Sequence, residues 1–209
     1  MNRLERLEEL YRRHHREARA PGFVFAASER CELFRRYVGG PGRRVLDLGC
    51  RDGALTRAYL AGNEVVGVDV DRHALAEASK QGIETVWADV EEPLPFEDES
   101  FDVVVAAELL EHLQEPEGLV REAARVLRPG GTFTGSVPNA FRLKNRLRFL
   151  AGRPPENDPT GLHLFRPQDM QALLAGLDDV RLEYVASRFL RLHPRLLANV
   201  IVFSARKPV

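Results

Sequence analysis

The sequence of 209 residues predicts an α/β fold, in which a doubly wound, mostly parallel sheet carries helices on both faces. Two observations support this prediction. Short apolar strands and amphipathic helices alternate between residues 44 and 137, which is the pattern of repeated βα units with right-handed crossovers. One strand, Phe101–Ala106, is apolar at every position except Asp102, as expected of a parallel strand that is covered on both faces.

The individual elements follow from hydrophobic spacing and from the residues that interrupt it. Leu4, Leu7, Leu10 and Tyr11 recur every three or four residues, which indicates an amphipathic first helix, and Pro21-Gly22 ends it. Seven strands are expected and no linker divides the chain, so we expect one domain. The expected strands are 44–48, 64–68, 85–88, 101–106, 132–137, 180–187 and 200–206, and the expected helices are 2–19, 27–38, 54–60, 74–80, 117–127, 141–150 and 167–174.

Composition argues against several functional classes. The formal net charge is −1, and no apolar run is long enough to cross a bilayer, so we expect neither a nucleic-acid partner nor a membrane span. The first residues mix charges with leucines and lack the apolar core of a signal peptide. Cys31 and Cys50, the only cysteines, have no metal-ligand spacing and are too few for a disulfide scaffold. We therefore expect a cytoplasmic protein without a bound metal.

The stretch from Val45 to Thr56 organises the rest of the chain. An apolar strand breaks at Gly49 and Gly53, and Ala54–Leu60 is then expected to be helical. This order of strand, glycine turn and helix places free backbone N–H groups and the positive end of a helix dipole at the carboxyl edge of the sheet. Open α/β sheets bind nucleotide-like ligands at that edge.

Aspartates at successive strand ends indicate what the ligand is. One Asp after a strand is ordinary, because Asp favours turns and helix caps, but Asp47, Asp69 and Asp89 would share one sheet edge. Asp69, one βαβ pass after Asp47, can accept both hydroxyls of a ribose. Asp89 can accept a hydrogen bond from an exocyclic amine such as that of adenine, and the Val90 N–H can donate a hydrogen bond to a ring nitrogen. The pocket therefore fits adenosine, whereas the pyrophosphate glycine pattern and a Gly-Lys-Ser/Thr motif are missing.

Further motifs follow in a fixed order and at fixed intervals across roughly residues 43–137. They are Leu46-Asp47-Leu48-Gly49-Cys50-Arg51-Asp52-Gly53, Val65-Val66-Gly67-Val68-Asp69, Ala88-Asp89, Leu94-Pro95-Phe96 with Ser100-Phe101-Asp102, Leu110-Glu111-His112-Leu113, and Arg125-Val126-Leu127-Arg128-Pro129-Gly130-Gly131. In this combination the chain resembles the class I S-adenosylmethionine-dependent methyltransferases. The resemblance implies a Rossmann-like sheet of seven strands whose last strand is inserted antiparallel. More loosely, the segment from Val137 to Phe165 resembles members that act on small molecules, quinone precursors or saccharides.

The resemblance also implies a cofactor, a reaction and a set of contacts. The cofactor would be S-adenosyl-L-methionine, the product S-adenosyl-L-homocysteine, and the acceptor a small molecule methylated by in-line transfer. Residues 1–42 would form a helical lid, 43–137 the cofactor-binding core, and 138–209 an acceptor-side segment with the last two strands. The implied cofactor contacts are Asp69 at the ribose, with Val70 beside it, Asp89 and Val90 at the adenine, and Asp47, Gly49, Cys50, Arg51, Gly53 and Ala106 around the methionine part.

Arg51 departs from the family motif, which has glycine at this position. Its side chain could clash with the cofactor, or could turn outward and pair with Asp52 or a substrate anion. We expect the harmless outward arrangement with a negative φ, because most turn positions then accept a side chain. A blocked site would instead indicate a non-catalytic S-adenosylmethionine-binding or partner-binding protein on the same fold. A Rossmann-type oxidoreductase is disfavoured because the glycine pattern that binds a pyrophosphate is missing.

His112 is the candidate general base, since it lies six residues beyond Ala106 and histidine titrates near neutral pH. A base is needed only if the acceptor must lose a proton. The alternative is that Glu111 and His112 brace the segment that follows them. His163, in the expected acceptor loop, is a second candidate.

Two basic stretches are expected to be solvated helix faces. The alternative for the first is a lid helix that meets an acidic or phosphorylated acceptor. The alternative for the second is steering of an anionic acceptor such as a carboxylate or a phosphorylated sugar or lipid. The first consists of Arg12, Arg13, His14, His15, Arg16 and Arg19, and the second of Arg142, Lys144, Arg146, Arg148 and Arg153.

Overall fold

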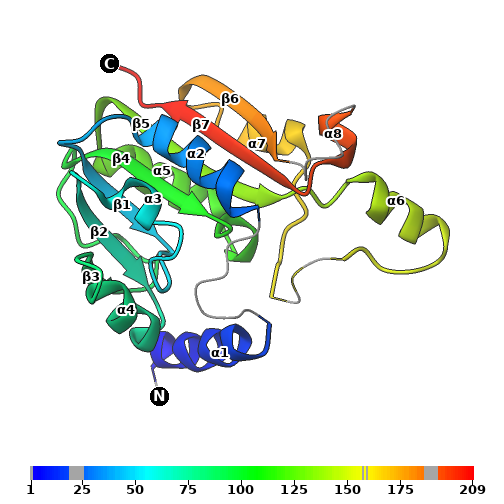
Figure 1. Ribbon diagram of the computed structural model, residues 1–209, viewed down its shortest axis with the longest axis horizontal. Coiled ribbons are helices and arrows are strands. Elements are labelled where there is room, and N and C mark those ends of the chain that lie inside the picture. Colours follow the sequence, from blue (N-terminus) through cyan, green and yellow to red (C-terminus); the bar gives the residue numbers. More distant parts are fainter. Residues whose placement is uncertain (1, 19–25, 157, 159, 186–192) are drawn as a thin grey trace.

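The computed structural model describes residues 2–18, 26–156, 158, 160–185 and 193–209. Its centre is a seven-stranded sheet in the order β3-β2-β1-β4-β5-β7-β6 (Figure 1). The pairs among β1 to β5 are parallel, and β7 lies antiparallel between β5 and β6. This confirms the predicted α/β sheet and its antiparallel last strand. The strands are β1 (Arg44–Leu48), β2 (Glu64–Asp69), β3 (Glu84–Trp87), β4 (Phe101–Ala107), β5 (Leu127–Pro138), β6 (Asp178–Val185) and β7 (Val200–Arg206).

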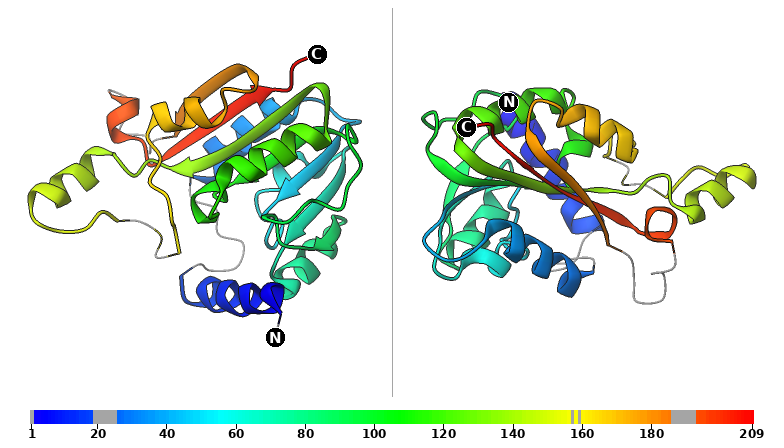
Figure 2. Two further views of the ribbon diagram at one scale, coloured as in Figure 1. Left: turned by 180° about the vertical axis from the view of Figure 1, so that it is seen from behind. Right: turned by 90° about the horizontal axis from the view of Figure 1, so that it is seen from above.

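Helices cover both faces of the sheet, as expected of a doubly wound fold (Figures 1 and 2). On one face α2 (Ala27–Val38), α3 (Arg57–Leu60) and α4 (Arg72–Ser79) contribute to a core around Phe34, Tyr59 and Ala78. On the other face α5 (Pro116–Val126) and α7 (Pro167–Leu173) contribute to a larger core. Two further helices, α1 (Arg3–Ala18) and α6 (Leu143–Leu150), stand apart from these layers. None of the helices in the described ranges is long and apolar enough to cross a membrane.

Several boundaries differ from those predicted by the sequence. The helix expected from Ala54 begins only at Arg57, because the preceding residues form turns around Gly53, whose φ is +74°. Strand β5 begins at Leu127 rather than at residue 132, since Leu127 already pairs with Phe101 across a register shift. The short helices η1 (Leu110–His112) and α8 (Pro194–Leu197) were not predicted. The strand expected at 180–187 occupies Asp178–Val185, and residues 186 and 187 lie outside the described ranges.

Candidate functional site

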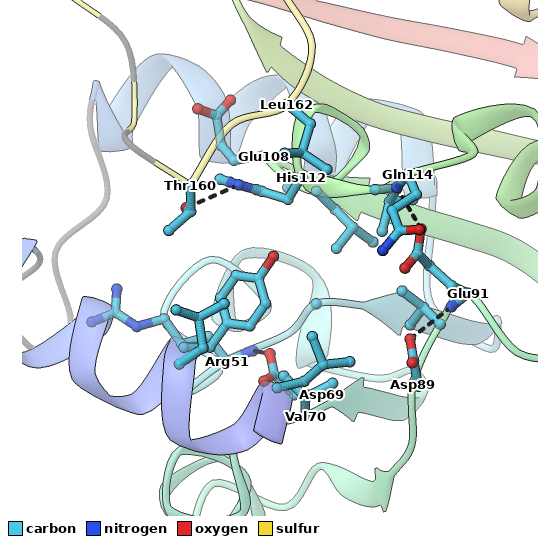
Figure 3. A pocket seen from close by; sticks show the side chains of 18 residues that line it. Arg51, Asp69, Val70, Asp89, Glu91, Glu108, His112, Gln114, Thr160 and Leu162 are labelled. Atoms are coloured by element: carbon cyan, nitrogen blue, oxygen red, sulfur yellow. Dashed lines mark hydrogen bonds between the residues drawn. The ribbon is translucent and has the colours of Figure 1, made fainter. Parts of the chain in front are cut away.

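A cavity of about 400 Å³ lies where the predicted site residues meet, at the carboxyl ends of β1, β2, β3 and β4 (Figure 3). This volume is within the usual range of small-molecule sites. Helix α1 covers it with Leu7, Leu10 and Tyr11, and Thr160 and Leu162 close another side. The predicted site residues that line the cavity are Gly49, Arg51, Asp69, Val70, Asp89, Val90 and His112, and those that do not are Asp47, Cys50, Gly53 and Ala106.

Asp47 lies behind the cavity and holds the glycine turn in place. The hydroxyls of Thr56 and Tyr59 donate to its Oδ2, at 2.6 and 2.7 Å. Burial raises the pKa of the Asp47 carboxyl to about 6, although these two hydrogen bonds act in the opposite direction. Cys50 is also buried, and burial raises the pKa of its thiol. Ala106 is fully buried, and its neighbour Ala107 lines the cavity instead.

Asp69 connects the end of β2 to the glycine turn. Its Oδ2 accepts the backbone N–H of Arg51 and its Oδ1 accepts that of Asp71, each at 2.9 Å. Arg51 has a φ of +51°, so the expectation of a negative φ was wrong. This left-handed conformation occurs in the turn that directs the Arg51 N–H toward Asp69. Arg51 is half-buried and belongs to the cavity lining (Figure 3).

Asp89 presents a buried oxygen that can accept a further hydrogen bond. Its Oδ1 accepts the N–H of Glu91 at 3.0 Å. Its Oδ2 lies 3.0 Å from Arg3 Nε, but not in hydrogen-bond geometry, and no group in the described ranges donates to it. A buried acceptor in this position fits a ligand with an N–H donor, such as the exocyclic amine of adenine.

Helix α1 is attached to the sheet edge by ion pairs. Arg3 pairs with Glu91 and Glu92, and Arg72 pairs with Glu8 at 2.6 Å. The hydrogen bond from Arg72 lowers the pKa of the Glu8 carboxyl. In the basic stretch at the end of α1, Arg12 and Arg13 are exposed, as a solvated face requires, whereas the side chains of residues 14–16 and all of residue 19 lie outside the description.

The cavity is acidic. Besides Asp69 and Asp89, it is lined by Glu91 and Glu108. Burial, and then the nearby carboxylates of Glu91, Asp158, Asp69 and Glu111, raises the pKa of Tyr11 to about 12. The negative side chains favour a cationic ligand over an anionic one. No cluster of His, Cys, Asp and Glu suited to a metal ion occurs in the part of the chain that the structure describes.

His112 connects the segment after β4 to the loop at Thr160. Its Nδ1 lies 3.1 Å from Thr160 Oγ1, and the same hydroxyl donates to Asp158 Oδ1 at 2.6 Å. Because the single hydroxyl proton goes to the carboxylate, His112 Nδ1 must donate to Thr160. His112 Nε2 is then the nitrogen that can exchange a proton, and it lies 3.7 Å from Glu111 Oε1. The edge of the Tyr11 ring also meets His112, with ring centroids 6.1 Å apart.

The sequence did not point to Asp158 or Thr160, because they lie in a loop without regular structure and far from His112 in the chain. The Glu111 carbonyl accepts the N–H groups of Leu162 and His163, so these bonds hold a loop far along the chain and not the segment directly after Glu111 and His112. His163 lies outside the cavity lining, and its Nε2 is 2.9 Å from the Leu113 carbonyl. That nitrogen therefore carries a proton and is not placed to accept one.

Comparison with known proteins agrees with this geometry. Residues 46–134 match the family model described as "Methyltransferase domain". A ubiquinone biosynthesis O-methyltransferase from Hahella chejuensis is 40% identical over 106 residues, which cover 47% of this chain and 44% of that protein. The chain thus spans about half the length of the curated relatives it matches.

Two solved structures show the same fold. A S-adenosylmethionine-dependent methyltransferase from Archaeoglobus fulgidus has a TM-score of 0.72 and 20% identity, covering 95% of this chain and 99% of that one. A phosphoethanolamine N-methyltransferase from Haemonchus contortus, solved with S-adenosyl-L-methionine, has a TM-score of 0.67 and 19% identity, covering 87% of this chain and 53% of that one.

Proposed function

We propose that this chain methylates a small-molecule acceptor with S-adenosyl-L-methionine as the methyl donor. The proposal is supported by the match of residues 46–134 to the methyltransferase domain and by a fold shared with an S-adenosylmethionine-dependent methyltransferase. The observation that carries the proposal is the convergence of Gly49, Asp69 and Asp89, from three strand ends, on one cavity. The buried Oδ2 of Asp89 adds an acceptor suited to adenine.

The residues divide into those that contact the cofactor and those that support them. Asp69 would accept the ribose hydroxyls, next to Val70, while Asp89 and the Val90 N–H would bind the adenine. Gly49, Arg51 and Ala107 would lie along the methionine part. Asp47, Cys50, Gly53 and Ala106 would act from behind, by fixing the turn and the end of β4.

S-adenosyl-L-methionine would supply a methyl group bound to a positively charged sulfur, and this sulfur becomes a neutral thioether when the methyl group passes to the acceptor. The chain's contribution would be alignment of the acceptor and exclusion of water, to which α1 and Thr160 would contribute because they border the cavity. The acidic lining favours the sulfonium charge. His112 would take the proton of an acceptor hydroxyl through Nε2, and the O-methyltransferase among the relatives supports that class of acceptor.

Calorimetry with S-adenosyl-L-methionine and S-adenosyl-L-homocysteine tests the proposal. Both should bind, and Asp89→Asn should weaken binding roughly ten- to a hundred-fold, since a hydrogen bond to a charged group contributes about 1.5–3 kcal/mol. Asp69→Ala should abolish binding, whereas Asp178→Asn, on exposed β6, serves as the control. If neither compound produced a heat of binding, the proposal would be disproved.

Fluorescence offers a second readout, because the chain has one tryptophan. The indole N–H of Trp87 donates to the carbonyl of Val70, which lines the cavity, at 2.9 Å. Binding should therefore change the emission of Trp87. A change with a nicotinamide cofactor alone would favour an oxidoreductase. Tight binding of S-adenosyl-L-methionine without its consumption in the presence of hydroxyl-bearing acceptors would favour the non-catalytic alternative.

A further inference from the structure

Helix α6 has its polar and apolar faces reversed relative to an ordinary surface helix. Asn145 faces inward with 1% of its surface exposed, donates to the Ala140 carbonyl, and accepts the Glu156 N–H at 3.0 Å. Leu147 and Leu150 lie on the opposite side of the helix, at 55% and 85% exposure, and Phe149 near its end is 61% exposed. We call Leu147, Phe149 and Leu150 the apolar tip.

The reversed orientation is held by specific contacts. Arg142 bonds to Asn199 and to Glu156, and Arg148 donates to the Pro154 carbonyl at 2.8 Å. The expected solvated basic face is thus correct for Lys144 and Arg146, which are exposed, and wrong for Arg142, which is largely buried by these contacts. Because polar groups fix α6 to the body, the apolar tip points away from it, and Figures 1 and 2 show α6 projecting at the end of the molecule far from α4.

Positive charges surround the apolar tip. Lys144, Arg146 and Arg153 are exposed next to it, and Arg142 and Arg148 lie deeper, so the segment 142–156 carries five cations against Glu156. This is a local concentration of charge in a chain whose net charge is only −1. Exposed Leu and Phe side chains flanked by Lys and Arg are the combination that binds the interface of an anionic membrane.

We propose that α6 docks this protein onto an anionic lipid surface, with the apolar tip inserted among the acyl chains and the surrounding cations on lipid phosphates. A second copy of the chain fits this surface less well. A symmetric contact would bring like charges together, and three side chains supply far less than the roughly 1,000 Å² that a stable interface buries. The proposal does not depend on the proposed methyl transfer.

Co-sedimentation of the full chain with vesicles tests it. The protein should bind vesicles that contain phosphatidylglycerol and should bind pure phosphatidylcholine much more weakly, and added salt should reduce the difference. Leu147→Ser with Leu150→Ser should lower the partition coefficient by about ten-fold or more. Arg146→Gln and Arg153→Gln should each lower it by about five-fold.

Matched controls lie at the opposite end of the molecule. Val209→Ser removes an exposed apolar side chain and Arg206→Gln an exposed cation, and both should leave vesicle binding unchanged. All variants should keep the wild-type unfolding temperature and affinity for S-adenosyl-L-methionine. Equal binding to both vesicle types, or full binding by the α6 variants, would overturn the proposal. The proposal would also be overturned if sedimentation velocity showed a wild-type dimer that the α6 substitutions, and not the control substitutions, convert to a monomer. The apolar tip would then bind a second copy of the chain.

Discussion

The carboxylate of Asp69 accepts the backbone N–H of Arg51 at 2.9 Å while Arg51 has a φ of +51°. The left-handed region costs a residue with a side chain about 1–2 kcal/mol, and glycine avoids that cost. Glycine, which the motif of the methyltransferases that this chain resembles has at this position, would adopt this conformation without that cost. In this chain the hydrogen bond to Asp69 holds the turn despite the presence of arginine.

Arg51→Gly should raise the free energy of unfolding by up to about 1 kcal/mol, because the relief of strain exceeds the extra freedom of glycine in the unfolded chain. Urea unfolding measures the change. Arg57→Gly is the matched control, since Arg57 lies in helix α3, where glycine should destabilise by about 1 kcal/mol. Equal destabilisation by the two substitutions would contradict the strain assigned to Arg51.

Asp47 should make stability depend on pH in a direction unusual for an aspartate. Its pKa is raised by burial from 3.8 to about 6, so the folded state binds the proton more tightly than the unfolded state. The resulting stabilisation is complete below pH 3.8 and is lost as the pH rises to about 6. The unfolding free energy of the wild type, relative to Asp47→Asn, should therefore fall by about 3 kcal/mol across this window. A difference that stays constant from pH 4 to pH 7 would show that Asp47 does not titrate in this way.

Gly135→Ala should destabilise the sheet by about 3 kcal/mol or more. A Cβ at this position would lie 2.1 Å from the Ala106 carbonyl oxygen and 2.6 Å from the Phe203 ring, and neither neighbour can move without disturbing β4 or β7. Thermal or urea unfolding would measure the loss. Gly176→Ala, at a position with no atom within 4 Å, should change stability by less than about 0.5 kcal/mol. Similar effects of the two substitutions would contradict the close approach of β5 to β4.

Thr160→Val should change the tautomer of His112. In the wild type, Thr160 donates to Asp158 and so requires a proton on His112 Nδ1. Nitrogen NMR of the imidazole should therefore show Nδ1 protonated, and the valine variant should shift the neutral ring toward the Nε2–H form. Thr85→Val, on strand β3, is the control. A wild-type ring with its proton only on Nε2 would reverse the assigned hydrogen bond and would contradict the role of Nε2 as the basic nitrogen of His112.

Much of this fold could be predicted from local sequence. Helix α2 and strands β1 and β7 have the predicted bounds, because apolar periodicity and glycine or proline breaks act within a few residues. Boundaries set by distant partners were missed. Helix α3 is shortened by a turn that Thr56 holds to Asp47, and β5 is lengthened by pairing of Leu127 with Phe101.

For the site, the sequence by itself determined which residues stand at the strand ends, since βα alternation brings the carboxyl ends of parallel strands to one edge. That was enough to place Asp69, Asp89 and Gly49 together. Only the tertiary structure decided that Asp47 does not line the cavity and that Thr160, which is bonded to Asp158, reaches His112. The same holds for α6, whose buried Asn145 and exposed Leu150 follow from contacts with Ala140 and Glu156. Helical periodicity shows that two faces differ, but which face turns inward depends on the partner against which the helix packs.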